Sequence, residues 1–184
     1  MKRILLLLWL LASSCSGLQA QRTTLRTNLL FWGTTTPNAG VEFSLGRNFT
    51  LVLDGGYNAW EFSNDMKLNL AFAQPEIRYW FCRRFEGHFI GLHGHYADAD
   101  ISNLDMFGLG HDRYDGKIYG AGISYGYQWI LGNRWSLEAS IGVGYVQNHY
   151  DKYDCPKCGE WKEKNDKGYF SVTKAAVSLI YVIK

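Results

Sequence analysis

The residues best suited to chemistry form a Cys-Pro-Lys-Cys-Gly motif late in the 184-residue chain. Cys155 and Cys158 are separated by two residues, and His149 lies just before them. Two thiolates at this spacing can bind one metal ion, although a structural zinc usually has four protein ligands. In an exported protein such a pair can instead close a disulfide. The motif predicts a disulfide or a metal site at Cys155 and Cys158, with a redox-active pair as a third interpretation. Zinc is the only cofactor that it suggests.

A second group is His93 and His95, whose spacing puts both on one face of a strand. Such a pair could bind a metal ion or act in acid–base catalysis, but the simpler interpretation is hydrogen bonding to a buried carboxylate. Asp100 and Ser102 follow, and a Ser, a His and an acidic residue are the groups that many hydrolases use. No nucleophile motif surrounds Ser102. We therefore expect a protein that is not an enzyme.

Seven charged residues fall on the same face of the expected strands as many Gly and Ser residues. A buried charge without a partner is strongly destabilising, so these side chains are expected to pair with one another inside the fold. The predicted interior charge network consists of Arg26, Glu42, Asp54, Glu76, Arg78, Glu138 and Lys174.

If side chains alternate between the two faces of each strand, with period two, these charged residues would all lie on the same face. This alternation is clearest from Trp135 to Tyr145, where Trp, Leu, Ala, Ile, Val and Tyr alternate with Ser, Glu, Ser, Gly and Gly. This pattern indicates strands with two different faces. Eight such segments are expected, at about 24–33, 38–45, 49–58, 68–82, 88–97, 115–130, 135–148 and 169–183.

Short turns and longer links alternate between these segments, which predicts an all-β fold, an eight-stranded antiparallel up-and-down barrel. Large aromatic residues lie at strand ends on the apolar face, and small or charged residues lie on the other face. Aromatic belts and a polar interior are typical of outer-membrane barrels. The sequence therefore predicts a transmembrane β-barrel with short periplasmic turns and longer outer loops. The alternative is a soluble barrel of the lipocalin type.

Residues 1–20 have the features of a secretory signal peptide. Lys2 and Arg3 precede an apolar run that ends at Ala12, far shorter than the ~20 residues of a spanning helix. Cleavage after residue 20 would leave residues 21–184 as one outer-membrane β-barrel domain, whereas cleavage before Cys15 would give a lipoprotein. The mature chain has 17 basic and 17 acidic residues, which does not favour nucleic-acid binding. The predicted location is the outer membrane of a Gram-negative bacterium, in contact with its lipid.

Three segments carry a resemblance to a known family. They are Asn28–Trp32 with the following Thr-Thr-Thr-Pro-Asn turn, Gln74–Phe81, and the Cys-x-x-Cys-Gly motif with Thr173–Ala175 after it. Together they resemble an uncharacterised family of small outer-membrane β-barrel proteins from Gram-negative gut and oral bacteria, sometimes encoded near fimbrial subunit genes. The resemblance covers nearly the whole mature chain and implies the barrel and its compartment. It implies no catalytic residues, because the family has no settled activity.

These observations predict a structural role, as an anchor or docking component of the cell envelope with an envelope or fimbrial protein as partner. A lumen filled by side chains leaves no diffusion pore. The alternatives are a lipid-modifying hydrolase of the outer membrane and a lipocalin-like binder. Cys82, at the other end of the barrel from the cysteine pair, is expected to be a free thiol. The predicted contact residues lie in the third and fourth outer loops: Asp100, Asp105, Phe107, His111, Tyr114, His149, Tyr153, Cys155, Cys158, Trp161 and Lys162.

Overall fold

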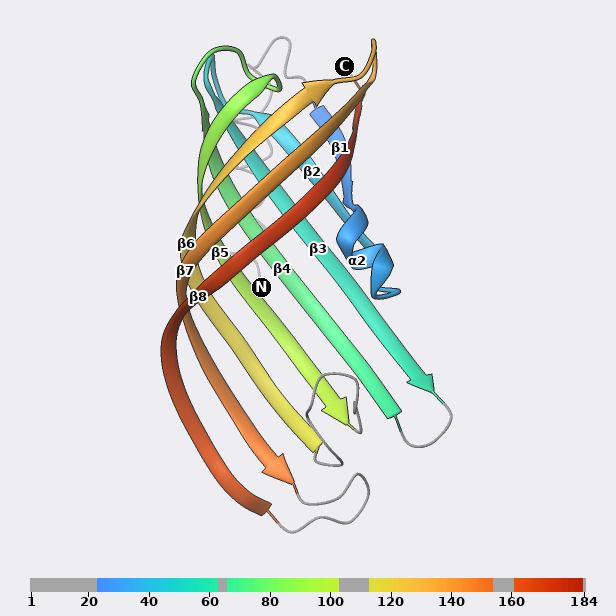
Figure 1. Ribbon diagram of the computed structural model, residues 1–184, viewed down its shortest axis with the longest axis vertical. Coiled ribbons are helices and arrows are strands. Elements are labelled where there is room, and N and C mark those ends of the chain that lie inside the picture. The colour runs from blue at the N-terminus through green and yellow to red at the C-terminus, as the bar shows by residue number, and fades with distance from the viewer. Residues whose placement is uncertain (1–22, 63–65, 103–112, 154–160, 184) are drawn as a thin grey trace, which may run out of the picture.

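The alternating segments form strands that pair in sequence order. The computed structural model describes residues 23–62, 66–102, 113–153 and 161–183. Within these ranges eight antiparallel strands make a closed barrel, in which β8 pairs with β1 (Figure 1). The elements are β1 (Thr23–Asn28), α2 (Leu29–Gly33), β2 (Asn38–Ser44), β3 (Phe49–Phe62), β4 (Met66–Trp80), β5 (Gly87–Ser102), β6 (Arg113–Ile130), β7 (Trp135–Tyr153) and β8 (Trp161–Val182). The predicted fold class, an all-β eight-stranded antiparallel barrel, is confirmed.

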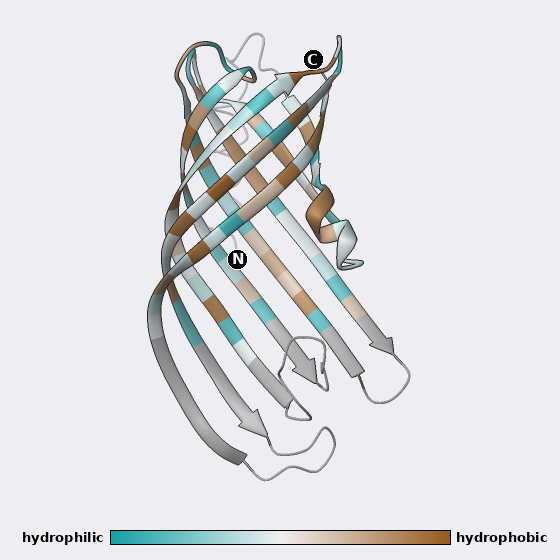
Figure 2. Cartoon of the chain, in the orientation of Figure 1, coloured by the Kyte–Doolittle hydropathy of each residue, from teal (hydrophilic) through white to brown (hydrophobic). Residues whose placement is uncertain are grey.

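The barrel is apolar outside and polar inside. Because successive side chains of a strand point to opposite faces, Ser140 is 9% exposed and its neighbour Ile141 is 58% exposed. Figure 2 shows the same alternation of hydrophilic and hydrophobic residues along the other strands. Most exposed large side chains are aliphatic or aromatic, whereas most buried side chains are polar or charged. This distribution is the reverse of that in a water-soluble protein.

The strands extend farther at one end of the barrel than the sequence pattern predicted. The three short turns lie together at the other end, with the start of β1 and the end of β8 (Figure 1). We call this the short-turn end and the opposite one the far end. β8 begins at Trp161 instead of near residue 169, and only residues 63–65 separate β3 from β4. Strand pairing needs only backbone partners, so it continues through polar segments that have no apolar face.

The expected strand at 24–33 is wrong in its second half, which forms α2. β1 ends at Asn28, whose side chain caps the helix by accepting a hydrogen bond from the Leu30 backbone N–H at 3.1 Å. Residues 29–32 are all apolar and do not alternate, so they fit a helical turn as well as a strand. The Phe31 ring turns toward the barrel interior and packs on Phe72 of β4, with ring centroids 4.6 Å apart.

Aromatic side chains fill the interior at the short-turn end. Trp80 and Phe89 are fully buried, with ring centroids 4.9 Å apart, and Phe85 folds back from the turn between β4 and β5 onto Trp80. The indole N–H of Trp80 donates to the Thr50 hydroxyl at 2.9 Å. Cys82, just after β4, is an exposed free thiol, as expected. No helix among the described residues is long and apolar enough to cross a membrane. The predicted signal peptide and Cys15 lie outside those residues.

Candidate functional site in the barrel interior

Glu138 of β7 lies at the centre of the interior charge network. Its carboxylate accepts two hydrogen bonds from the guanidinium of Arg26 on β1, at 2.7 and 3.2 Å. It accepts two more from Arg78 on β4, at 2.7 and 3.1 Å. Paired contacts of this kind are the strong form of the arginine–carboxylate interaction. The Ser140 hydroxyl adds a fifth hydrogen bond at 3.2 Å. All three charged side chains are buried.

Glu76 binds the remaining cation of the network. Its Oε2 is 2.8 Å from Nε of Arg78 and 2.6 Å from Nζ of Lys174 on β8. Its other oxygen accepts a hydrogen bond from the Ser124 hydroxyl. Arg78 also lies over the Phe89 ring, with the guanidinium carbon 4.3 Å from the ring centroid. The network therefore rests directly on the aromatic residues of the short-turn end.

Glu42 and Asp54 complete the network. Glu42 lies 3.5 Å from both guanidinium groups and accepts a hydrogen bond from Thr50 at 2.7 Å. Asp54 is 3.2 Å from Nε of Arg26. All seven residues predicted to face the interior therefore do so, and they come from six of the eight strands. Because every charge has a partner of opposite sign, the network is the kind of buried cluster that a fold can tolerate.

The two histidines lie just beyond the network toward the far end. His93 is buried, and its Nε2 is 2.8 Å from the Thr173 hydroxyl. The rings of His93 and His95 lie 6.1 Å apart. Among the described residues neither Nδ1 has a hydrogen-bond partner, and none of these residues supplies the predicted carboxylate. Within the described part of the chain no three His, Cys, Asp or Glu residues are arranged to hold a metal ion.

A bulge in β8 explains how Thr173 reaches His93. Val172 pairs with Val143 of β7 and Lys174 pairs with Gly142, so the bulge leaves Thr173 without a partner of its own. An extra residue of this kind bends a strand and redirects its side chains. Thr173 and Lys174 consequently both point inward, one to the histidines and the other to Glu76. Period two alone does not predict this.

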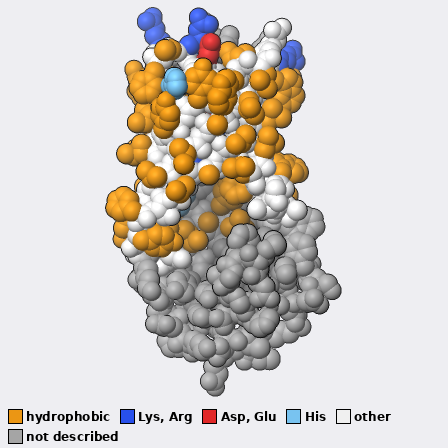
Figure 3. Space-filling model, in the orientation of Figure 1, with side chains coloured by type: hydrophobic (Ala, Val, Ile, Leu, Met, Phe, Trp, Pro, Cys, Tyr) orange, Lys and Arg blue, Asp and Glu red, His pale blue; other side chains and the backbone are white. Residues whose placement is uncertain are grey.

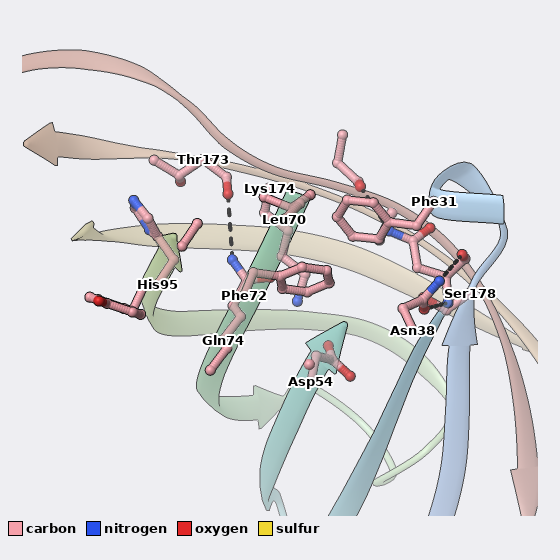
Figure 4. Close-up of a pocket in the computed structure, with 17 residues that line it drawn as sticks. Phe31, Asn38, Asp54, Leu70, Phe72, Gln74, His95, Thr173, Lys174 and Ser178 are labelled. Atoms are coloured by element: carbon pink, nitrogen blue, oxygen red, sulfur yellow. Dashed lines mark hydrogen bonds between the residues drawn. The ribbon is translucent and has the colours of Figure 1, made fainter. Parts of the chain in front are cut away.

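A cavity of about 220 Å³ lies next to His95, on the far side of the charge network (Figure 4). Phe31, Leu70 and Phe72 line it with apolar surface. Its polar lining includes Asp54, Gln74, His95 and Lys174. A shallower hollow of about 510 Å³ lies around Pro75 and Gly94, and three tyrosines border it: Tyr96, Tyr119 and Tyr145.

Two side-chain amides replace strand pairing at the edge of β8. Asn28 accepts a hydrogen bond from the Val177 N–H at 3.1 Å and donates to the Ala175 carbonyl at 3.2 Å. Gln74 reaches across from β4 and donates to the Thr173 carbonyl at 3.4 Å (Figure 4). The sequence reasoning missed both residues. Gln74 has the same parity as Glu76 and Arg78, a signal that would have placed it inside.

The other sequence-predicted sites include residues or side chains that lie outside the described part of the chain. Cys155 and Cys158 lie outside the described residues, as does the side chain of His149. Ser102 and His95 are seven residues apart on the same strand, β5, which is about 23 Å at ~3.3 Å per residue. The side chain of Ser102 lies outside the described residues, so the alternative of a Ser–His contact stays a prediction.

Residues 4–183 match a family described as "Protein of unknown function (DUF3575)". The chain belongs to this family. A search of curated proteins gave no match. The description of the family assigns no activity, so a function for this member has to come from its own geometry.

Proposed function

We propose that the protein is a small outer-membrane barrel with a closed interior, which anchors or docks another component of the cell envelope. The observation that carries this proposal is two rows of aromatic side chains on the outward face. Near the short-turn end Trp135 packs on Tyr181 and Tyr127 packs on Trp129, with ring centroids 5.0 and 4.8 Å apart. Toward the far end a second row of exposed side chains follows: Tyr57, Tyr96, Tyr119, Tyr145 and Phe170.

The distance between the two rows fits a bilayer. Tyr119 and Trp129 are ten residues apart on β6, as are Trp135 and Tyr145 on β7. Ten residues of strand are about 33 Å long, which at a tilt of ~40° gives a height of about 25 Å. The apolar band of an outer-membrane barrel is also about 25 Å tall and has aromatic residues at both borders.

The positions of the charged residues agree with the two aromatic rows as the borders of the apolar band. Between the two rows, no Asp, Glu, Lys or Arg of the described strands faces outward. The short turns beyond the first row carry the charges Arg47, Arg83, Arg84, Glu86 and Arg134. Figure 3 shows basic side chains at this rim and hydrophobic side chains over the wall next to it. A charge facing lipid near the bilayer midplane would be destabilising, so this distribution supports a membrane location.

The interior supports an anchoring role over a transport role. Trp80 and Phe89 fill the interior at the short-turn end, and the ion-paired network fills the layer next to it. Eight strands give an interior that side chains can fill completely. The part of such a protein that is left to meet other molecules is its loops.

The membrane location is tested by gel migration of the outer-membrane fraction in cold detergent, with and without boiling. We expect the protein in that fraction, and we expect boiling to change its apparent mass because folded barrels resist cold detergent. Recovery in the soluble periplasmic or secreted fraction, with no change on boiling, would contradict the proposal.

The docking role is tested by replacing residues 103–112 and 154–160 with short Gly-Ser segments. The replaced chain should keep its shift on boiling and lose retention of its envelope partner after cross-linking in intact cells. A fimbrial subunit is the first partner to probe. Retention of the same partner by the replaced chain would exclude these segments as the docking surface.

A further inference from the structure

We propose that the interior cavity behind α2 binds the hydrocarbon end of a membrane lipid, which reaches it through the side of the barrel between β3 and β8. The inference rests on the proposed function, because only a barrel embedded in a bilayer has lipid chains against its wall. It adds to that function a binding site and the chemical class of its ligand.

The part of the barrel wall between β3 and β8 is built differently from the rest of the wall. β1 pairs with β8 only at residues 178–182, and β2 pairs with β3 only at residues 50–56. Farther along, these two long strands have no strand between them among the described elements. Figure 1 shows α2 at this place, beyond the ends of β1 and β2. One helical turn therefore stands where hydrogen-bonded strands close the wall elsewhere.

α2 presents apolar side chains to both sides of this wall. Leu29, Leu30 and Trp32 are exposed on the outside, 42%, 49% and 55% respectively. Phe31 points the other way and lines the cavity, where it packs on Phe72. The helix thus continues the outward hydrophobic face and places one aromatic ring between that face and the cavity.

Displacing α2 would leave every strand pair of the barrel intact. The edge of β8 next to α2 is satisfied by the side chains of Asn28 and Gln74. Asn28 belongs to β1, and Gln74 reaches the edge from inside the barrel. Open backbone edges are not tolerated in hydrocarbon. Because side-chain amides already cover these groups, an opening beside α2 does not expose them.

The lining of the cavity contains polar residues, but it exposes more apolar than polar surface, which favours a hydrocarbon chain over a polar headgroup. Of the polar residues, Asn28, Gln74 and Thr173 are already hydrogen-bonded within the protein. The apolar residues of the lining include Phe31, Leu70, Phe72, Ala97 and Ala176. Its one cation, Lys174, is bound to Glu76 at 2.6 Å and is not available to a phosphate or carboxylate. A volume of about 220 Å³ is below the ~300 Å³ of the smallest drug-sized pockets, so it fits the end of a chain and not a whole lipid.

Photolabelling tests this assignment. The full chain is reconstituted in phosphatidylcholine vesicles that contain a phosphatidylcholine with a diazirine near the end of one acyl chain, and adducts are mapped by peptide mass spectrometry. Leu92 and Ile123, which face outward, report contact with bilayer lipid. Leu70 and Phe72, which line the cavity, report a bound chain. We expect adducts on both pairs.

Three variants sharpen the result. Ala97→Phe fills the cavity and should abolish the adducts on Leu70 while leaving those on Leu92. Ala71→Phe is the matched control, because Ala71 pairs with outward-facing Tyr57, and it should change neither. Phe31→Ala removes the ring next to the cavity and should increase the interior adducts. Gel migration before and after boiling verifies that each variant is folded.

The outcomes separate the two proposals. Adducts on outward residues without any on Leu70 or Phe72, in both the natural chain and Phe31→Ala, would overturn the lipid site and leave the membrane barrel standing. Interior adducts that persist in folded Ala97→Phe would also overturn it. Absence of adducts on the outward residues would contradict the membrane location itself.

Discussion

At the scale of single residues, Glu138 is the carboxylate of the charge network that receives paired hydrogen bonds from two arginines. It accepts hydrogen bonds from guanidinium groups on two other strands, β1 and β4. Two arginines that close together would repel each other without a carboxylate between them. The charge of Glu138, and not only its shape, is therefore what the interior needs.

Glu138→Gln tests this dependence on charge. The amide keeps the size of the side chain but leaves two buried cations short of an anion. We expect the free energy of unfolding in detergent to fall by about 3–5 kcal/mol, measured by urea titration with gel migration as the readout. Glu86→Gln is the control, because Glu86 and Arg83 form an exposed ion pair with a distance of 3.8 Å. This substitution should change the free energy of unfolding by about 1 kcal/mol or less. Equal effects of the two substitutions would contradict the role of the network.

Gly142 makes room for the buried imidazole of His93. A Cβ at this position would lie 2.8 Å from Cε1 of His93 and 3.1 Å from the Ile123 carbonyl oxygen. Gly142→Val should therefore lower the free energy of unfolding by about 1–3 kcal/mol in the same titration. Ala139→Val, on the outward face of the same strand, should change it by about 0.5 kcal/mol or less. If Gly142→Val left the free energy of unfolding unchanged, His93 would have space to move.

At the scale of elements, Asn28 performs two tasks at the junction of β1 and α2. Its side chain caps the helix and also binds two backbone groups of β8. A residue placed elsewhere on β1 could do only one of these. The position of α2 in the wall therefore depends on this one amide.

Asn28→Ala should destabilise the folded barrel by about 1–3 kcal/mol, because it removes a helix cap and leaves an N–H and a carbonyl of β8 without partners. The measurement is the urea midpoint of the boiling-sensitive gel band. Asn133→Ala, in an exposed short turn, serves as control and should leave the midpoint unchanged. Equal midpoints for Asn28→Ala and the natural chain would show that α2 contributes nothing to the wall.

The sequence predicted the parts of the structure that depend on period two. Arg26, Glu42 and Glu138 could be placed inside because each shares its parity with small or polar neighbours. α2 was missed because residues 29–32 are uniformly apolar and have no parity. The inward turn of Thr173 was missed because a bulge changes parity within β8. The extra length of β8 was missed because polar residues that pair as a strand look like a loop in sequence.

At the scale of the whole molecule, the interior is layered along the barrel axis. Aromatic residues fill the short-turn end, ion pairs fill the next layer, and the cavity follows. In the described part of the chain, the first two layers consist of buried side chains packed or ion-paired with one another. A closed interior of this kind is expected to separate the two ends of the barrel.

Electrical recording checks this separation. The protein, inserted into a planar bilayer from detergent, should produce no stable conductance steps, because both layers exclude hydrated ions. Gel migration of the same sample verifies that the barrel is folded. Steady steps that scale with salt concentration would contradict a closed interior and would revive a channel function.

The charge network has a consequence for how the chain assembles. Its members come from both ends of the sequence, and Arg26 on the first strand meets Glu138 on the seventh. A partly formed sheet of three or four strands would hold some of these charges without their partners. Unpaired buried charges would disfavour such intermediates, so we expect folding and closure of the barrel to occur as a single cooperative event. The full set of ion pairs can then form only when all the strands have closed into the barrel.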